Sequence, residues 1–267
     1  MLKRLGVDLR EMVREQFEYR ELMYQMTMRD LRLRYKQTVM GFGWAIFMPL
    51  VNTAIFSVIF TKVAPVEPPV PYPVFAYCGL LVWNFFSMSL KFAVNSLTSN
   101  ANLVTKVYFP REIFPLSAVL VCLVDFVVAA AVLGGLMAWY GIPLHASLLF
   151  LPAVLAVHIL FTSGIALLLA MSNLFYRDVK YLFEIVVTMW MFASSTVYPV
   201  DQIEGRLGLV MRLNPMTGII ESYRSVILYG TLPDPTWFAG TAAVAFAVFL
   251  LSWLTFHRAE FRFAENI

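Results

Sequence analysis

The chain has 267 residues, of which 60% are hydrophobic and 14% are charged, and its formal net charge is +3. Soluble domains carry about 25% charged residues, so this composition excludes an ordinary soluble enzyme and indicates a protein with several membrane spans. The net charge is too small to predict a nucleic-acid partner, and the informative feature is where the charges lie along the chain.

Residues 1–43 are polar and contain nine Lys and Arg residues interleaved with acids. Apolar side chains recur there at helical spacing, from Val13 and Phe17 through Tyr24 to Tyr35. The pattern predicts one or two amphipathic helices in the membrane interface, with basic side chains toward the lipid headgroups. A helix packed on a partner protein is the alternative. Because no apolar stretch of about 7–15 residues follows the basic start, we expect no cleavable signal peptide.

Six apolar runs follow, and each is a candidate membrane span. They are Trp44–Thr61, Val74–Asn95, Ile113–Tyr140, Leu148–Leu174, Leu182–Val197 and Trp237–Phe256. With the N-terminus in the cytoplasm, fifteen Lys and Arg residues lie in the inner segments and four lie in the outer segments. Since positive residues accumulate on the cytoplasmic side, the sequence predicts six spans with both termini cytoplasmic.

The last outer loop, residues 199–235, is long and apolar. It contains two short helical patterns, Ile203–Leu213 and Gly218–Tyr229. Neither is long enough to cross a bilayer, which takes about 20 residues. We therefore expect two short re-entrant helices in the outer leaflet, with a small folded outer cap as the alternative. Glu221 and Arg224 are three residues apart and are expected to form an ion pair.

A polar segment, residues 98–115, separates the second apolar run from the third and contains Lys106 and Arg111. Residues Asn100–Tyr108 can form about two helical turns before Pro110 ends them. We predict a short helix on the cytoplasmic face at the edge of the membrane. An ordinary solvated loop is the commoner alternative for such a segment.

The sequence has no GxxxxGK[ST] motif, no GxGxxG loop opening a helix, no HExxH and no CxxC. We therefore expect no nucleotide hydrolysis, no catalytic or cofactor-binding residue and no metal site in this chain. Cys78 and Cys122 lie in apolar runs and are expected to be buried thiols. His145, His158 and His257 are scattered and lack ligand spacing.

Polar and aromatic side chains within the apolar runs are the remaining candidates for function. Asp125 lies near mid-depth of the third run, where an ionisable group is either functional or satisfied by Ser, Thr or Asn neighbours. The candidate channel-lining residues are Trp83, Asn84, Phe85, Phe86, Trp190, Phe192 and Tyr198. Flat rings with few charges suit the apolar faces of sugar rings, although plain helix packing is the commoner role of any one ring.

Five segments resemble the membrane subunits of ABC-2 type polysaccharide exporters, and they occur in the same order. They are RDLRLRYKQTVMGFGWAIFMPL (29–50), NLVTKVYFPREIFPLSAVL (102–120), NLFYRDVKYL (173–182), YPVDQI (198–203) and LNPMTGIIESYRSVILYG (213–230). The likeness covers nearly the whole chain and is specific to the branch that exports O-antigen, teichoic acid and capsular polysaccharide. It implies an all-α membrane protein of the bacterial inner membrane, with a gate region in 1–43 and a six-span domain in 44–267.

The resemblance also implies partners. Members form homodimers around a continuous channel, and each protomer binds a separate cytoplasmic ATPase subunit (Wzt-like in the O-antigen case) that holds ATP and Mg²⁺. Segment 98–115 corresponds to the coupling segment of the family. The residues expected to dock on the ATPase are Asn102, Leu103, Val104, Thr105, Lys106, Val107, Tyr108, Phe109, Arg111 and Glu112.

The helix before the first span corresponds to the gate helix of the family, near the pyrophosphate of a lipid-linked substrate. The gate residues expected there are Arg29, Arg32, Arg34, Tyr35 and Lys36. Their cationic side chains can form charge-assisted contacts with phosphates. They can also fix orientation and bind anionic lipids.

Together these inferences predict the permease subunit of an ATP-driven exporter that moves undecaprenyl-pyrophosphate-linked O-antigen-type polysaccharide from cytoplasm to periplasm. An ABC-2 exporter of teichoic acid, capsule or a small molecule is the first alternative. A membrane-embedded glycosyl or phosphoglycosyl transferase is the second, and it would need paired carboxylates or a metal cluster at one membrane face.

Overall fold

The computed structural model describes residues 12–36, 38–41, 43–63, 65–107, 109–203 and 205–263. This described part of the chain consists of helices and connecting turns without any strand, which confirms the expected all-α class. In chain order the α-helices are α2 (Arg20–Tyr35), α3 (Gly43–Val58), α4 (Tyr72–Ser99), α5 (Ala101–Lys106), α6 (Ile113–Trp139), α7 (Leu151–Phe175), α8 (Val179–Phe192), α9 (Gly205–Leu213), α10 (Pro215–Arg224) and α11 (Pro235–Ala259). Residues 12–18 are also helical.

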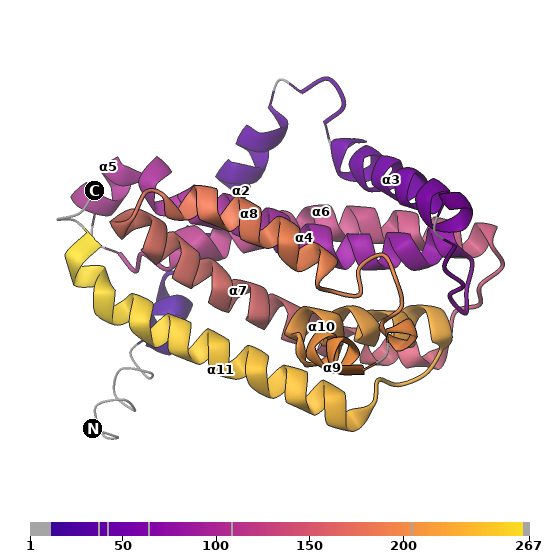
Figure 1. Cartoon of the computed structure of the whole chain (residues 1–267). Coiled ribbons are helices and arrows are strands. Elements are labelled where there is room, and N and C mark those ends of the chain that lie inside the picture. The colour runs from indigo at the N-terminus through magenta and orange to yellow at the C-terminus, as the bar shows by residue number, and fades with distance from the viewer. Residues whose placement is uncertain are drawn as a thin grey trace.

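Helix α4 is the centre of the bundle and packs on α3, α6, α7 and α10. Its buried aromatic and aliphatic side chains lie on more than one face, so it is covered on several sides. Helix α11 lies along α7 on the outside of the bundle (Figure 1). Gly164 makes that contact close, because a Cβ there would lie 2.8 Å from the Cα of Phe249.

Five helical segments are long and apolar enough to cross a membrane, which confirms a membrane-spanning architecture. They are Gly43–Val63, Tyr72–Ser99, Ile113–Trp139, Ala146–Phe175 and Pro235–Arg262. The fifth predicted run, Leu182–Val197, differs because α8 has 14 residues and ends at Phe192. The chain continues in turns, where Arg224 binds the carbonyls of Ser195 and Thr196. The count of six spans therefore stays a prediction.

The two short helices expected in the last outer loop are present as α9 and α10. Asn214 separates them, and its side chain accepts a hydrogen bond from the backbone N–H of Met216 as the N-cap of α10. Helix α10 is largely buried against α4, α7 and α11. The predicted pair of Glu221 and Arg224 forms at 2.8 Å. The placement of both helices in the outer leaflet remains a prediction.

Different helices and loops lie at the two ends of the bundle. Helix α5 and the C-terminal end of α11 lie at one end, and the α9–α10 hairpin lies at the other (Figure 1). Segment 98–115 and the α9–α10 hairpin therefore lie at opposite ends of the same long helices.

Candidate functional site

The last turn of α2 reaches the membrane-embedded carboxylate of α6. The Arg34 Nη1 atom lies 2.5 Å from Asp125 Oδ2, and the Tyr35 hydroxyl donates a hydrogen bond to Asp125 Oδ1. The Arg34 guanidinium also lies 4.5 Å from the ring centroid of Phe92. The charge of Asp125 is therefore compensated by Arg34 of α2. Among the described residues the partners of this carboxylate are Arg34 and Tyr35, not the Ser, Thr or Asn neighbours considered as one alternative.

This Arg34–Tyr35–Asp125 cluster is half-buried and mixes a full ion pair with a phenol. Burial and the hydrogen bond to Asp125 raise the pKa of Tyr35 above its ordinary value, so its hydroxyl stays protonated and donates at neutral pH. A carboxylate placed among apolar helices is costly without a cation beside it. Arg34 supplies that cation, and the pair fixes the C-terminal end of α2 against α6.

A cavity of about 370 Å³ adjoins the cluster between α2, α3, α4 and α6. Arg34 and Asp125 form a charged part of its wall, and apolar side chains such as Trp44, Met48 and Phe85 form much of the rest. The combination suits an elongated apolar group that carries an anionic end, because the chain can enter the apolar part while the cation faces its charge.

The other predicted gate residues fall into two kinds. Arg29 is held by Asp30 at 2.8 Å and donates to the Asn100 side chain at 3.0 Å, so it ties α2 to the end of α4. Arg32 and Lys36 are exposed, and within the described ranges neither forms an ion pair. The structure thus brings Arg34 and Tyr35 to one carboxylate and leaves two cations facing outward.

The coupling segment has an outward face and an inward face. Its exposed predicted docking residues are Asn102, Thr105, Lys106 and Val107. Val104 and Phe109 are buried in a cluster with side chains of α4, α6, α7 and α11, and Leu103 packs against it. Tyr108 lies outside the described residues. The short helix predicted here is confirmed as α5, with one side fixed to the bundle.

Arg111 and Glu112 anchor the segment to the C-terminal end of α11. The Arg111 side chain donates to the Val104 carbonyl at 3.2 Å and to the Glu260 carbonyl at 3.0 Å. Its backbone N–H donates to a Glu260 carboxylate oxygen at 2.9 Å. Glu112 is 1% exposed and lies 3.3 Å from His257 Nδ1. In this chain both side chains are thus engaged within the bundle, Glu112 almost fully buried and Arg111 partly so, and their role in docking stays a prediction.

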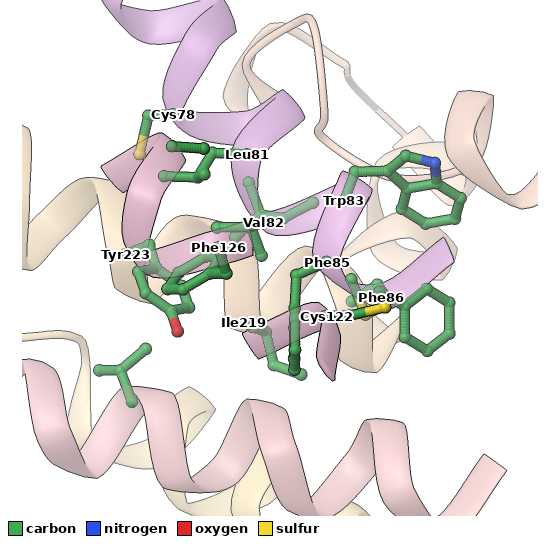
Figure 2. Close-up of a cluster of buried hydrophobic side chains, with 14 of the residues drawn as sticks. Cys78, Leu81, Val82, Trp83, Phe85, Phe86, Cys122, Phe126, Ile219 and Tyr223 are labelled. Atoms are coloured by element: carbon green, nitrogen blue, oxygen red, sulfur yellow. The ribbon is translucent and has the colours of Figure 1, made fainter. Parts of the chain in front are cut away.

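Most of the predicted channel-lining rings lie inside this single chain. Trp83, Phe85 and Phe86 are buried in the central hydrophobic cluster (Figure 2). Phe86 lies 5.3 Å from Trp190 between ring centroids, and the Trp190 indole donates to Asn214 at 3.0 Å. These contacts are those of plain helix packing. Residues of the predicted set that retain exposed surface are Asn84, Trp190, Phe192 and Tyr198.

Sequence reasoning missed the surroundings of Arg224 apart from its pairing with Glu221. Arg224 is fully buried, donates to the carbonyls of Ser195 at 2.6 Å and Thr196 at 2.8 Å, and lies 3.5 Å from the Phe75 ring centroid. The three-residue spacing indicated only the carboxylate partner. Every residue has a backbone carbonyl, so the sequence does not show which carbonyls Arg224 binds.

Comparison with known proteins shows which family the chain belongs to. Residues 21–228 match the family of ABC-2 type transporters. The chain belongs to that family. The matched range begins within α2 and ends just after α10, so the Asp125 cluster and the coupling segment both lie inside it. With its long apolar helices, the chain is a membrane-embedded, multi-pass ABC-2 permease, and the family implies an ATPase partner.

Similar proteins match nearly end to end. The O-antigen export system permease protein RfbA of Myxococcus xanthus is 30% identical over 258 residues, which is 96% of this chain and 99% of that protein. A protein of the same name from Klebsiella pneumoniae is 28% identical over 92% of this chain and 94% of its own length. The polysialic acid transport protein KpsM of Escherichia coli is 24% identical over 96% of this chain and 98% of its own length.

Proposed function

We propose that this ABC-2 permease is the membrane subunit of an ATP-driven exporter of undecaprenyl-pyrophosphate-linked O-antigen-type polysaccharide, from cytoplasm to periplasm across the bacterial inner membrane. The observation that carries the proposal is the end-to-end similarity to permeases named for O-antigen export. The chain acts as a homodimer and has no catalytic residue of its own. ATP and Mg²⁺ are bound by the partner ATPase, and the free energy of transport comes from there.

The ATPase docks on the outward face of the coupling segment, which consists of Asn102, Thr105, Lys106 and Val107. These four side chains are exposed on a short helix whose other side is fixed in the bundle. Because packed interiors transmit displacement, a force that the ATPase applies to the exposed face of α5 is passed through its buried face to α4 and α6. In this account Arg111 and Glu112 hold the segment rather than contact the ATPase, and Phe109 and Val104 pack beneath it.

The lipid pyrophosphate binds first at Arg32 and Lys36, the exposed cations at the end of α2. It then competes with Asp125 for Arg34. A pyrophosphate carries more charge than a carboxylate and offers more acceptor oxygens, so it can replace Asp125 as the partner of the guanidinium. Exchange releases the end of α2 from α6, and the cavity beside the cluster is placed to receive apolar chain. Asp125 thereby acts as a positioning residue for the gate.

The sugar chain passes between protomers, along surfaces that this chain leaves open. The predicted channel-lining residues that retain exposed surface and fit this role are Asn84, Trp190, Phe192 and Tyr198. The buried rings Trp83 and Phe86 instead support the wall from behind. An amide and accessible rings give contact area to a moving polymer without a fixed charge that would trap it.

Export of capsular polysaccharide is the second candidate. It is favoured by the match to KpsM, a protein named for polysialic acid transport, over 96% of this chain. The two candidates share the coupling segment and the gate and differ in the polymer that enters.

The experiment that tests the proposal removes this chain from cells that contain its cognate ATPase. We expect lipid-linked polymer to accumulate on the cytoplasmic side and surface polysaccharide to disappear, and the intact chain to restore both. Chemical analysis of the accumulated polymer separates O-antigen from capsule. Normal surface polysaccharide in those cells would contradict export by this chain.

A further inference from the structure

Three segments that are distant in the sequence bring titratable side chains together beneath the coupling segment. Glu15 comes from the helical residues 12–18, Glu112 immediately precedes α6, and His257 lies in the last turn of α11. One ligand atom from each lies within 4.8 Å of the others. The sequence predicted no metal site, because these residues lie about a hundred or more positions apart.

Glu112 is the residue whose buried carboxylate most needs a compensating cation. Its side chain is 1% exposed, and its Oε2 atom has no hydrogen-bond partner within the described ranges. A buried carboxylate costs several kcal/mol unless a cation or donors compensate it. Arg111, the neighbouring residue, does not compensate it, because its guanidinium is directed to Glu260 and to the Val104 carbonyl.

The distance between His257 and Glu112 also indicates a shared cation. His257 Nδ1 lies 3.3 Å from Glu112 Oε1. A direct charge-assisted hydrogen bond is shorter, at about 2.7–2.9 Å. Two ligands that bind one tetrahedral Zn²⁺ through bonds of about 2.0–2.1 Å lie roughly 3.3 Å apart. The spacing therefore fits two ligands of one ion better than a close ion pair.

We propose that Glu15, Glu112 and His257 bind one divalent cation of the zinc class. Two carboxylates and a neutral imidazole balance the charge of such an ion, and a nitrogen ligand favours Zn²⁺ over Mg²⁺, which prefers oxygen. Glu260 Oε2 lies 3.9 Å from His257 Nδ1 and stands beside the site, engaged by Arg111. The ion fastens the N-terminal helix, the start of α6 and the end of α11 to one another under the coupling segment.

The test uses the full-length chain in lipid nanodiscs, stripped with a chelator and then incubated with Zn²⁺. Bound metal is measured by mass spectrometry, and affinity by titration. We expect one Zn²⁺ per chain and at least about tenfold weaker binding in Glu15→Gln, Glu112→Gln and His257→Asn, since even indirect partners of metal ligands contribute that much. Glu18→Gln removes the same charge from an exposed position of the same helix and should bind as the parent does.

Glu15 is only half-buried, so Glu15→Gln reports on binding even if the Glu112 variant fails to fold. A chain without stoichiometric Zn²⁺, or one whose Zn²⁺ persists undiminished in all three ligand variants, would overturn the site. Binding that prefers Mg²⁺ to Zn²⁺ would overturn the role of His257. These readouts are independent of transport, so the site can fail while the export proposal stands.

Discussion

The two ends of the bundle are held by different kinds of polar contact. At the α5 end, polar side chains from separate segments meet, as in the ion pair of Arg111 with Glu260 and the contact of His257 with Glu112. At the hairpin end, Arg224 is fully buried and binds mainly backbone carbonyls. Side-chain partners can exchange, whereas backbone carbonyls move only if the chain moves with them. The comparison indicates a fixed α9–α10 end and an α5 end whose contacts can be rearranged.

The largest effect on stability is expected at the α9–α10 end, where Arg224 is buried. Arg224→Met removes the donor for the carbonyls of Ser195 and Thr196 and leaves them buried and unsatisfied. Breaking a buried charged contact of this kind costs roughly 3–5 kcal/mol of unfolding free energy. Thermal or denaturant unfolding of the solubilised chain measures it, with Arg206→Met on exposed α9 as control. Equal stability of the two variants would mean that the carbonyl contacts contribute little.

A smaller loss of unfolding free energy is expected when a larger side chain crowds the contact between Arg224 and the Thr196 carbonyl. A Cβ on Gly79 would lie 2.0 Å from the Thr196 carbonyl oxygen and 2.6 Å from Arg224 Nη2. Gly79→Ala should therefore cost about 1–3 kcal/mol through overpacking. Gly134→Ala is the matched control in α6, because nothing lies within 4 Å of its Cβ, and it should be neutral or slightly stabilising. The idea of a rigid outer end fails if both glycines tolerate alanine equally.

At the gate, the effect on stability should be modest and the effect on transport large. Asp125→Asn keeps an acceptor for Tyr35 but removes the charge that faces Arg34. We expect a loss of about 1 kcal/mol, with tighter binding of lipid pyrophosphate and slower export, because Arg34 no longer has a competitor. A double-mutant cycle with Arg34→Gln measures the coupling. Additive effects of the two substitutions would show that the pair does not act as a unit.

The smallest change in stability is expected at the exposed cations of α2. Arg32→Gln and Lys36→Gln should change unfolding free energy by less than about 0.5 kcal/mol, because both side chains are exposed. Binding of lipid-linked pyrophosphate should weaken, most clearly at low ionic strength. Arg20→Gln at the start of α2 is the matched control. If all three variants bind the lipid equally, the cations serve orientation alone.

The sequence was most informative where helices are long and apolar. The runs that became α3, α4, α6, α7 and α11 were predicted within a few residues, because length and hydropathy determine them. The prediction for α8 was less accurate, since its end depends on Arg224 binding carbonyls from a distant segment. No local pattern could reveal that contact.

In the candidate site, likewise, single residues could be predicted from the sequence but their partners could not. Its position in an apolar run singled out Asp125 from the sequence, and the family resemblance placed Arg34 among the gate residues and Arg111 among the docking residues. Their partners were not predictable, because Asp125 meets Tyr35 across 90 positions and Arg111 meets Glu260 across 149. Aromatic content likewise identified Trp83 and the neighbouring rings, but only packing showed that they are interior.

The central claim is that the coupling segment is anchored on one side and docks the ATPase with the other. The most direct measurement is the affinity of the cognate ATPase for the chain in nanodiscs that carries Lys106→Glu and Val107→Ser on the exposed face. Lys62→Glu is the control, because Lys62 is exposed in the π-helical turn that follows α3. The account predicts an affinity at least about tenfold weaker, about 1.4 kcal/mol, with an unchanged unfolding temperature. Undiminished binding of the ATPase to the doubly substituted chain would contradict it.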